Sequence, residues 1–447
     1  MALGWTLPRL AQTNSMADTQ LRQKLHMDCW RLRDACFEPD ASSDHFRLHV
    51  ASENASELLS TVCQFRSVIL HPLRSSTLRH LQRDIVRVTD RSRLPRFPLV
   101  DDELTLLWVR WEQGYSDSLG GFMLPLAERA ARKRLPTRLA VSGLRHPTLA
   151  ERLRSLAPGV CASERANPPV LPRCSAACYK EVRVCSMPMY SSNPWRAMAA
   201  IDQRWLGMPA PLPTEPLAQR SFTVIFGQRW GRAGRRIVNL AELVSACNHT
   251  AVALPGVGAA AVKLACRMLP ESTPPATKAR EIRKAQAFVS MYGGETINAL
   301  HLPYGGSVVQ IFNEAFVETK PPQWVRDQEY YIMGGTSRRG KQPLRYYSVV
   351  MSANRTQWEP KCAEWVRRQR AHSSATRIEQ LRQLYDKCNG HRANMTADWP
   401  SLRRTLERVV RDQRLSAGDW QRGASDVRQQ SPVGRGRGVD PSSWQTR

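Results

Sequence analysis

The sequence predicts an α/β protein with two Rossmann-like, doubly wound domains that face a cleft, followed by a C-terminal helical segment. Short apolar runs alternate with helical patterns over most of the chain, as strands and their covering helices do. A proline-rich stretch at 207–219 interrupts this alternation, which then restarts. The 447 residues are also enough for two domains with appendages.

Five segments are expected along the chain. Proline-rich sequence does not continue the interior of a sheet or helix, so the domain boundary is placed there. The final stretch contains Gly, Ser, Gln and Arg with almost no apolar residues, which indicates disorder. The predicted segments are an N-terminal extension (1–40), an N-terminal α/β domain (41–212), a C-terminal α/β domain (213–353), a helical segment (354–414) and a disordered basic tail (415–447).

The elements of the first half follow from its apolar patterns. A helical pattern spans Thr19 to Cys36 in the extension. Beyond it, short apolar runs predict strands, and apolar residues three and four apart predict helices. The strands are expected at 46–50, 67–71, 104–111 and 138–142, and the helices at 120–136 and 149–156.

The second half repeats this alternation more clearly. Asn239 and Glu242 offer an N-cap and its partner three residues later, so a helix is expected to begin there. Strands that alternate with helices predict a parallel, doubly wound sheet. The strands are expected at 221–226, 251–255, 287–292 and 307–312, and further helices at 279–286, 378–385 and 402–410.

Charge and hydropathy limit the functions to consider. Lys and Arg total 65 against 39 Asp and Glu, and 55 of the basic residues are Arg. The net charge of +26 favours an anionic partner such as nucleic acid, but the Arg residues are spread along the chain and the Arg-Gly run at 434–438 is short. A solvated basic surface is the simpler interpretation. The sequence contains no run of about 20 apolar residues, so no transmembrane span is expected. The first 15 residues show no clear signal or anchor.

The 11 Cys residues leave the cellular compartment open. In an oxidising lumen they would form disulfides with one thiol left over, and in the cytosol they would be buried thiols. Cys174, Cys178 and Cys185 could instead contribute to a zinc site, although their spacing fits no standard module. N-glycosylation sequons, which matter only in the secretory pathway, occur at Asn54, Asn248, Asn354 and Asn394.

Two glycine-containing stretches partly match nucleotide-binding motifs. Residues 256–261 (GVGAAA) formally match a dinucleotide fingerprint, but Pro255 interrupts the motif and no acidic residue ends a following strand. Residues 227–236 (GQRWGRAGRR) lack the Gly-Lys-Ser/Thr ending of a P-loop. They still place guanidinium groups directly after a strand, where these can reach a diphosphate. The four residues are Arg229, Arg232, Arg235 and Arg236.

A third turn, Tyr292-Gly293-Gly294, ends a predicted strand. Glycine lets backbone amides approach a ligand, and a helix is expected to begin at Glu295 or Thr296 with its N-terminus at the same place. A further turn at 303–306 precedes the next strand. This arrangement can hold the phosphates and sugar of an activated donor.

Together these motifs resemble the catalytic region of glycosyltransferase family 61, over about 101–350. The residues that carry the resemblance are Arg229, the RRIxNxxE stretch at 235–242, the turn with Asn298, Leu300, Leu302, Pro303 and Gly306, the Leu344-Arg345-Tyr346-Tyr347 stretch, and Cys178-Tyr179-Lys180 with Val182 and Val184. Three positions depart from the family pattern. Tyr292 stands where the family has His, Glu295 where it has Gly, and Gln310 where it usually has Glu.

The resemblance implies a two-domain enzyme of the GT-B type, with an acceptor-side N-terminal domain and a nucleotide-sugar C-terminal domain. It implies transfer of sugar from a UDP-xylose or UDP-N-acetylglucosamine type donor to a glycan or glycoprotein in the Golgi or endoplasmic reticulum lumen. The nucleotide sugar would be a co-substrate, with no cofactor or metal required. The donor-binding residues expected on this basis are Arg229, Arg235, Arg236, Tyr292, Gly293, Gly294, Glu295, Thr296 and Asn298.

An inverting transfer needs a base for the acceptor hydroxyl and cations for the departing diphosphate. Asp117 is the candidate base, because it precedes a predicted helix on a loop of the N-terminal domain. Arg229 with Arg235 or Arg236 would stabilise the diphosphate. The replacement of His and Glu keeps a first alternative open, a catalytically silent glycan- or nucleotide-binding protein. A basic nucleic-acid-binding protein is the second.

Overall fold

The structure, a computed structural model, describes the chain in separate stretches. The described residues are 29–39, 46–51, 85–88, 94–100, 104–108, 123–124, 126–127, 138–142, 147–156, 159–162, 171–185, 193–208, 221–228, 236–253, 261–270, 272–314, 343–352, 355–357, 364, 379 and 394–415. Within them the protein is mixed α/β. Its sheets contain parallel strands, and one sheet curls like half a barrel.

The chain divides into two compact units, each described by itself below. The first unit comprises Met1–Arg110, Pro136–Leu144 and Val160–Ser192, and the second comprises Trp111–Leu135, Arg145–Gly159 and Asn193–Arg447. These limits differ from a single boundary at the proline-rich linker. Helices α6 (Pro147–Leu156) and α7 (Pro194–Leu206) belong to the second unit, although both precede the linker in the sequence.

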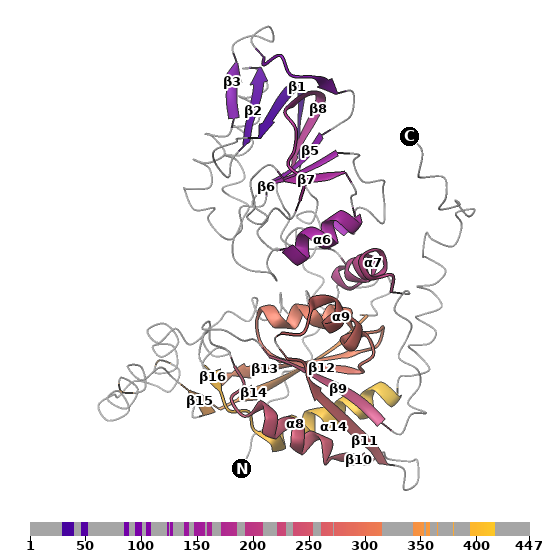
Figure 1. Cartoon of the computed structure of the whole chain (residues 1–447). Coiled ribbons are helices and arrows are strands. Elements are labelled where there is room, and N and C mark those ends of the chain that lie inside the picture. The colour runs from indigo at the N-terminus through magenta and orange to yellow at the C-terminus, as the bar shows by residue number, and fades with distance from the viewer. Residues whose placement is uncertain are drawn as a thin grey trace, which may run out of the picture. The chain divides into compact units, whose positions relative to one another are not determined.

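The first unit contains a mixed sheet in the order β3-β2-β1-β8-β5-β6-β7, with β4 also paired to β8 (Figure 1). Strand β1 is antiparallel to β2 and β8, whereas β5 is parallel to β8 and β6. Buried side chains such as Phe37, Leu48 and Val182 form its core. The strands are β1 (Cys29–Pro39), β2 (Phe46–Ala51), β3 (Ile85–Val88), β4 (Leu99–Val100), β5 (Leu104–Trp108), β6 (Arg138–Ser142), β7 (Val160–Ala162) and β8 (Ala177–Cys185).

Strand β1 corrects the sequence prediction for the N-terminal extension. The helix expected across Thr19 to Cys36 is wrong from Cys29 onward, because Cys29–Pro39 is a strand. Its backbone pairs with a strand on each side, and Leu32, Ala35 and Phe37 are buried in the sheet's core. Pairing with β8, which lies about 150 residues later, is a tertiary effect that overrides a short local periodicity.

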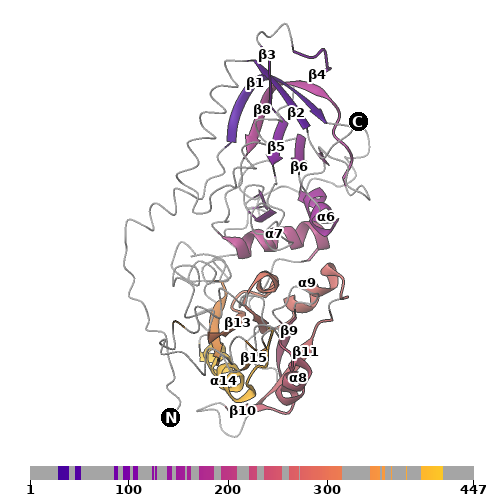
Figure 2. The ribbon, with the colours of Figure 1, turned by 90° about the vertical axis from the view of Figure 1, so that its left-hand side faces the viewer.

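The second unit contains a six-stranded sheet in the order β10-β11-β9-β12-β13-β14, parallel except for β10 (Figures 1 and 2). Every residue of β12 and β13 is buried, as expected for central strands covered on both faces. Helices α8 and α14 lie on one face and α9 on the other. The elements are β9 (Ser221–Gly227), α8 (Leu240–Asn248), β10 (Ala251–Ala253), β11 (Ala261–Met268), α9 (Pro275–Arg283), β12 (Ala287–Met291), the 3₁₀ helix η4 (Gly294–His301), β13 (Ser307–Asn313), β14 (Arg345–Met351) and α14 (Trp399–Leu415).

Most predicted elements of this unit are confirmed, including the strands at 221–226, 287–292 and 307–312 and the helix at 402–410. The predicted strand at 67–71, the helix at 378–385 and the basic tail from 416 lie outside the described residues. Of the helix predicted at 120–136, only 123–124 and 126–127 are described, and these residues are helical and buried.

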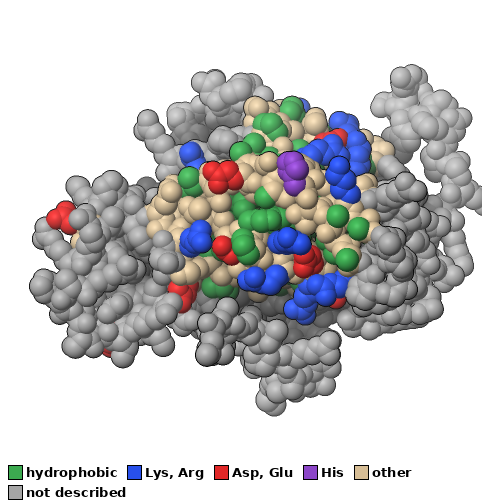
Figure 3. Space-filling model, turned by 90° about the horizontal axis from the view of Figure 1, so that it is seen from below, with side chains coloured by type: hydrophobic (Ala, Val, Ile, Leu, Met, Phe, Trp, Pro, Cys, Tyr) green, Lys and Arg blue, Asp and Glu red, His purple; other side chains and the backbone are tan. Residues whose placement is uncertain are grey.

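The charge on the described surface is mixed. On the face shown in Figure 3, Lys and Arg side chains lie among Asp and Glu side chains and form no continuous basic patch over the described part. On α14, Arg403 and Arg408 pair with the acidic residues four positions later, Glu407 and Asp412. No helix in the described part of the chain is long and apolar enough to cross a membrane.

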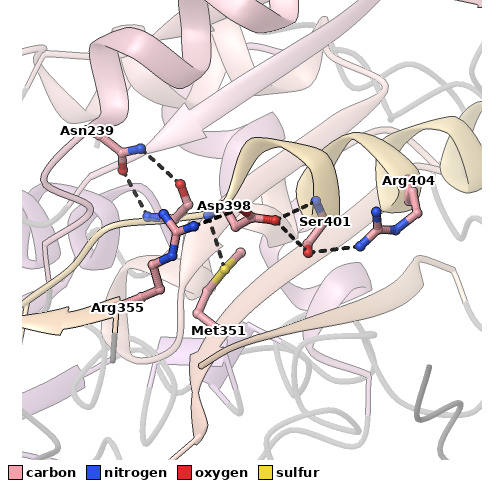
Figure 4. A network of polar contacts seen from close by, with 7 residues as sticks. Asn239, Met351, Arg355, Asp398, Ser401 and Arg404 are labelled. Carbon is pink, nitrogen blue, oxygen red and sulfur yellow. Dashed lines mark hydrogen bonds and ion pairs between the residues drawn. The ribbon is translucent and has the colours of Figure 1, made fainter. Parts of the chain in front are cut away.

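Helix α14 is anchored to the sheet at its N-terminal end (Figure 4). The carboxamide of Asn239 donates to the carbonyl of Ala397 and accepts from its amide, each at 2.9 Å. Asp398 accepts hydrogen bonds from the amide and hydroxyl of Ser401, the arrangement of a helix N-cap. Asn239 was expected to cap α8, but it makes no side-chain cap bond there and instead holds the segment that precedes α14.

The C-terminal end of α14 is hydrogen-bonded to the same sheet at the amino ends of two central strands. The side-chain amide of Gln413 donates to the carbonyl of Gln286 and to the hydroxyl of Ser307, just before β12 and at the first residue of β13. A small sheet of β15 (Thr356–Gln357) and β16 (Asn394–Met395) lies at the other end, where Met395 also pairs with Ile237. These contacts make the C-terminal helix part of the second unit.

Candidate functional site

The sheet of the second unit has a topological switch point beside β9. From β9 the chain passes through α8 and β10 to β11 on one side, then returns through α9 to β12 on the other side. In open parallel sheets, ligands bind beyond the carboxyl ends of the strands at such a point. Strand β9 ends at Gly227 and β12 at Met291, so the segments that follow these two strands form the candidate site.

The turn after β12 has the backbone that the sequence predicted for a close approach. Gly293 has φ 121° and ψ −161°, a conformation open to glycine and costly for other residues. Helix η4 begins at the next residue as a 3₁₀ helix, where an ordinary helix was expected to begin at Glu295 or Thr296. Gly293, Gly294 and Glu295 are partly exposed, so their backbone is accessible at the carboxyl edge of the sheet.

This turn lies against the end of β9. A Cβ placed on Gly227 would be 2.4 Å from Cζ of Phe288 and 3.2 Å from Cγ of Glu295, so only glycine fits there. Glu295 also forms an ion pair with Lys278 of α9 at 3.4 Å, with both side chains largely buried. The structure therefore brings the last residue of β9 close to the turn after β12.

A buried hydrogen-bond chain lies beneath the turn and crosses three neighbouring strands. The hydroxyl of Thr296 contacts that of Ser290 at 3.0 Å and accepts from the side-chain amide of Gln310 at 3.2 Å. Tyr346 donates its hydroxyl proton to the carbonyl oxygen of Gln310 at 2.5 Å. Ser290, Thr296 and Gln310 are fully buried, so the amide of Gln310 acts as donor and acceptor within the protein.

Two further residues predicted to bind the donor make contacts inside the protein. The ring of Tyr292 is buried and stacked on Phe312 with centroids 5.5 Å apart, and its hydroxyl accepts from the side-chain amide of Asn313 at 3.4 Å. The carboxamide of Asn298 donates to the carbonyl of Glu295 at 3.1 Å, within η4 itself. In this structure Tyr292 belongs to the core beneath the turn, and Asn298 stabilises the turn.

The predicted diphosphate-binding arginines are described only at Arg236. Its amide donates to the side-chain oxygen of Asn394 and its carbonyl accepts from the amide of Met395. Ile237 follows Arg236 and is held by Gln228, which lies directly after β9. The side-chain amide of Gln228 donates to the carbonyl of Ile237, and its side-chain oxygen accepts from the amide of Ile237. The segment that closes the arginine-rich turn is thereby fixed at the carboxyl edge. Arg229, Arg232, Arg235 and the candidate base Asp117 lie outside the described residues.

A buried ionic cluster lies beside η4 and was missed by sequence reasoning. One carboxylate oxygen of Asp202 on α7 accepts from Nη2 of Arg283 at 2.6 Å and from Nδ1 of His301 at 2.8 Å. Asp202 is completely buried, His301 is 1% exposed, and the Arg283 side chain is 12% exposed. The three residues lie about 80 and 20 positions apart in the chain, so no local pattern could associate them.

The protonation states in this cluster follow from its burial. Burial raises the pKa of Asp202, but the adjacent His301, Arg283 and Arg152 outweigh burial and lower it overall. Burial lowers the pKa of His301 more than Asp202 raises it. His301 is therefore neutral near pH 7 and carries its proton on Nδ1, facing the Asp202 carboxylate. The cluster is an anion held between a guanidinium group and a neutral imidazole.

Six of the described cysteines form three disulfides, which removes the zinc interpretation for Cys174 and Cys178. Cys36 pairs with Cys178, Cys161 with Cys174, and Cys247 with Cys266. Among the described residues, no group of His, Cys, Asp and Glu is arranged to hold a metal ion. Disulfides are characteristic of proteins in oxidising compartments.

Two of the four sequons are described. The side-chain nitrogen of Asn248, to which a glycan would be attached, donates to the carbonyl of Cys266 at 3.0 Å, next to the Cys247–Cys266 disulfide. Asn394 is partly buried, and its side-chain oxygen accepts from the amide of Arg236. Asn54 and Asn354 lie outside the described residues.

The dinucleotide fingerprint at 256–261 does not have the context that the motif requires. A dinucleotide-binding turn joins a strand to a helix that opens at the glycines. Here the run connects β10 to the antiparallel strand β11, which begins at Ala261. The strand order therefore agrees with Pro255 in disfavouring a nicotinamide or flavin site at this position.

Comparison with known proteins finds no protein-family model that matches the chain and no curated protein with significant sequence similarity. The site therefore has to be interpreted from its own geometry. That geometry comprises a glycine turn and a buried ionic cluster at the two ends of the 3₁₀ helix η4, together with the backbone of Arg236, which Asn394 and Met395 hold.

Proposed function

We propose that the protein is a glycosyltransferase of the GT-B type that binds a nucleotide sugar at the carboxyl edge of β9 and β12. The observation that supports this most is the proximity of the turn after β12 to the end of β9 at the switch point of a parallel sheet. A diphosphate fits such an edge, because backbone amides and guanidinium groups both donate to phosphate oxygens.

The proposed donor site divides its tasks between the two segments. The backbone of Gly293, Gly294 and Glu295 would approach the donor phosphates, and Arg236, with Arg229 and Arg235 in the preceding turn, would balance their charge. The donor would be of the UDP-xylose or UDP-N-acetylglucosamine type. The three disulfides support a lumenal location, in the Golgi or endoplasmic reticulum, with a glycan or glycoprotein acceptor.

In the proposed inverting reaction, a base removes the proton from the acceptor hydroxyl as its oxygen attacks the anomeric carbon. The bond from that carbon to the diphosphate breaks, and the nucleoside diphosphate leaves with the bonding electrons, stabilised by the arginines. Asp117 is the proposed base. Gln310 cannot take this role, because its amide is neutral and both of its ends are engaged in the buried chain.

A second candidate, a protein that binds nucleotide sugar or glycan without transfer, is favoured by one specific observation. Tyr292 and Gln310 occupy the positions of the family's His and Glu, and both are buried with partners inside the protein. Neither side chain is available to exchange a proton with a bound substrate. Catalysis would then depend entirely on Asp117 and the arginines.

The test uses the full-length protein and a panel of nucleotide sugars. A ligand at 100 times its dissociation constant adds about 2.7 kcal/mol to stability, so a donor should raise the melting temperature measurably. Product analysis with glycan acceptors then separates the candidates: transfer supports the enzyme, and stabilisation without transfer or hydrolysis supports the silent binder. No stabilisation by any nucleotide sugar or by any of the glycan acceptors would refute both.

Gly293→Ala gives a site-directed version of this test, since the substitution strains a backbone at φ 121° in the proposed phosphate turn. Gly207→Ala is the matched control. It places the same change at another positive-φ glycine, the C-cap of α7, where an added Cβ would meet nothing within 4 Å. We expect Gly293→Ala to abolish the donor response and Gly207→Ala to retain it.

A further inference from the structure

We propose that Asp202 is a positioning residue for the candidate donor site. It holds helix η4 in place through two contacts, with His301 of η4 and with Arg283 of α9. The inference rests on the proposed function only for the identity of the ligand. The geometry alone shows that a single carboxylate connects three elements of the second unit: α7, the last residue of α9 and the last residue of η4.

Helix η4 is held by α7 at its C-terminal end and by α9 at its N-terminal end. At its C-terminal end, Asp202 of α7 binds His301, and the indole of Trp195, also on α7, donates to the carbonyl of Leu302 at 2.9 Å. At its N-terminal end, Glu295 pairs with Lys278 of α9. Because Arg283 of α9 binds the same oxygen of Asp202 as His301 does, the two attachments are mechanically connected.

Stability alone does not account for such a cluster. Bringing a carboxylate and a guanidinium group out of water costs several kcal/mol, and replacing buried ion pairs by apolar residues is often neutral or stabilising. The cluster also leaves polar atoms buried without a hydrogen-bond partner among the described residues. These are the second carboxylate oxygen of Asp202, Nε and Nη1 of Arg283, and Nε2 of His301. Arrangements of this kind occur where a specific geometry matters more than stability.

The position of η4 sets the geometry of the proposed donor site. Gly294 begins the helix and Glu295 lies against the end of β9, so a displacement of the η4 C-terminal end is transmitted to the exposed turn over only seven residues. The buried contacts of Thr296 fix the middle of this segment on the sheet. Asp202 thus determines where the backbone amides of the turn lie relative to the arginine-bearing segment.

The test compares Asp202→Asn with Asp398→Ala in the full-length protein. The control removes a carboxylate that also has several partners, but at the N-terminus of α14, which covers the other face of the sheet. UDP-N-acetylglucosamine and UDP-xylose are the probes, and their dissociation constants are measured by calorimetry. We expect Asp202→Asn to weaken binding at least tenfold and Asp398→Ala to change it less than twofold.

Hydrogen exchange of the η4 amides tests positioning without a ligand. The amides of Thr296 and Leu302 donate within the turn, and we expect them to exchange at least tenfold faster in Asp202→Asn than in Asp398→Ala, after correction for global stability. If the wild-type protein binds neither probe, the proposed function fails while this measurement still decides the positioning role. Equal η4 exchange in the two variants would overturn the proposal.

A double variant separates positioning from simple destabilisation. Asp202→Asn leaves the guanidinium of Arg283 buried without its anion, and adding Arg283→Met removes that uncompensated charge. The double variant should therefore regain much of the lost stability. Because the double variant still lacks the charged carboxylate that holds His301, its η4 exchange should stay fast, and recovery of both stability and η4 protection would also contradict the proposal.

Discussion

Gly227→Ala is the sharpest test of how closely the turn after β12 lies against β9. The added Cβ would sit 2.4 Å from Cζ of Phe288, a distance that real Cβ atoms essentially never show, and 3.0 Å from Cε2 of the same ring. The Phe288 ring is completely buried, so it cannot simply swing into solvent. Overpacking of this kind costs roughly 1–3 kcal/mol. Alanine also lowers the entropy of the unfolded chain, which returns about 0.4–1 kcal/mol.

The net expectation is a loss of about 1–2 kcal/mol in the free energy of unfolding, measured by urea denaturation. The double variant with Phe288→Leu identifies the cause, since relief of the clash makes the two changes less than additive. Glu295 lies within 3.2 Å of the same Cβ, so the proposed donor affinity should fall together with stability. A variant as stable as wild type would refute this packing of β9, Phe288 and η4.

Three further changes test other parts of the second unit. His301 has a lowered pKa and faces Asp202, Arg283 and Arg152; the unfolded chain therefore takes up a proton that the folded protein resists, and stability should fall as pH drops below about 6.5. In urea titrations, His301→Gln should reduce the difference in the free energy of unfolding between pH 7.5 and pH 5.5. An unchanged difference would contradict the assignment of this pH dependence to His301. Asp398→Ala removes the N-cap of α14, so thermal unfolding should show a loss of about 0.5–2 kcal/mol in the free energy of unfolding. Arg355→Ala removes only a half-exposed ion-pair partner of Asp398 and should lower the free energy of unfolding by no more than about 0.5 kcal/mol. Gln310→Glu replaces a buried donor with a carboxylate and should cost about 1–3 kcal/mol, more at pH 8 than at pH 5, because burial raises the carboxyl pKa; equal stability at pH 8 would exclude this.

The fold of the second unit could be predicted because its signals are local. Runs such as 287–292 and 307–312 are mostly apolar, which is typical of buried parallel strands, and the helices of this half have amphipathic spacing. The first unit was harder, since β1 gains its strand character from β2 and β8 and not from its own sequence. The sequence prediction also assigned the residues of α6 and α7 to the N-terminal domain, because the proline-rich linker is visible in the sequence. The elements against which a helix packs are not visible there.

The candidate site could be predicted in part for the same reason. The glycines of the turn at 292–294 indicate an unusual backbone conformation, which the sequence alone shows. The strand order then places this turn at the switch point of the sheet. The inward direction of Tyr292 was not predictable, since an aromatic residue at a strand end can face core or solvent. Asp202 and His301 looked like ordinary helix and turn residues, and only the tertiary fold brings them within 2.8 Å.

The strong positive charge of the chain has a more limited meaning once the described residues are considered. Several arginines are engaged in the protein's own structure: Arg283 binds Asp202, Arg152 lies 4.4 Å from the ring centre of Trp205, and Arg403 pairs with Glu407. Arg152 is buried and the Arg283 side chain is only 12% exposed, so these two guanidinium groups are not available to a polyanion. The described arginine whose position matters for a bound phosphate is Arg236, because Asn394 and Met395 fix its backbone at the carboxyl edge. The anionic ligand that we propose is therefore a small diphosphate at the carboxyl ends of the strands, and not a nucleic-acid backbone bound across a surface.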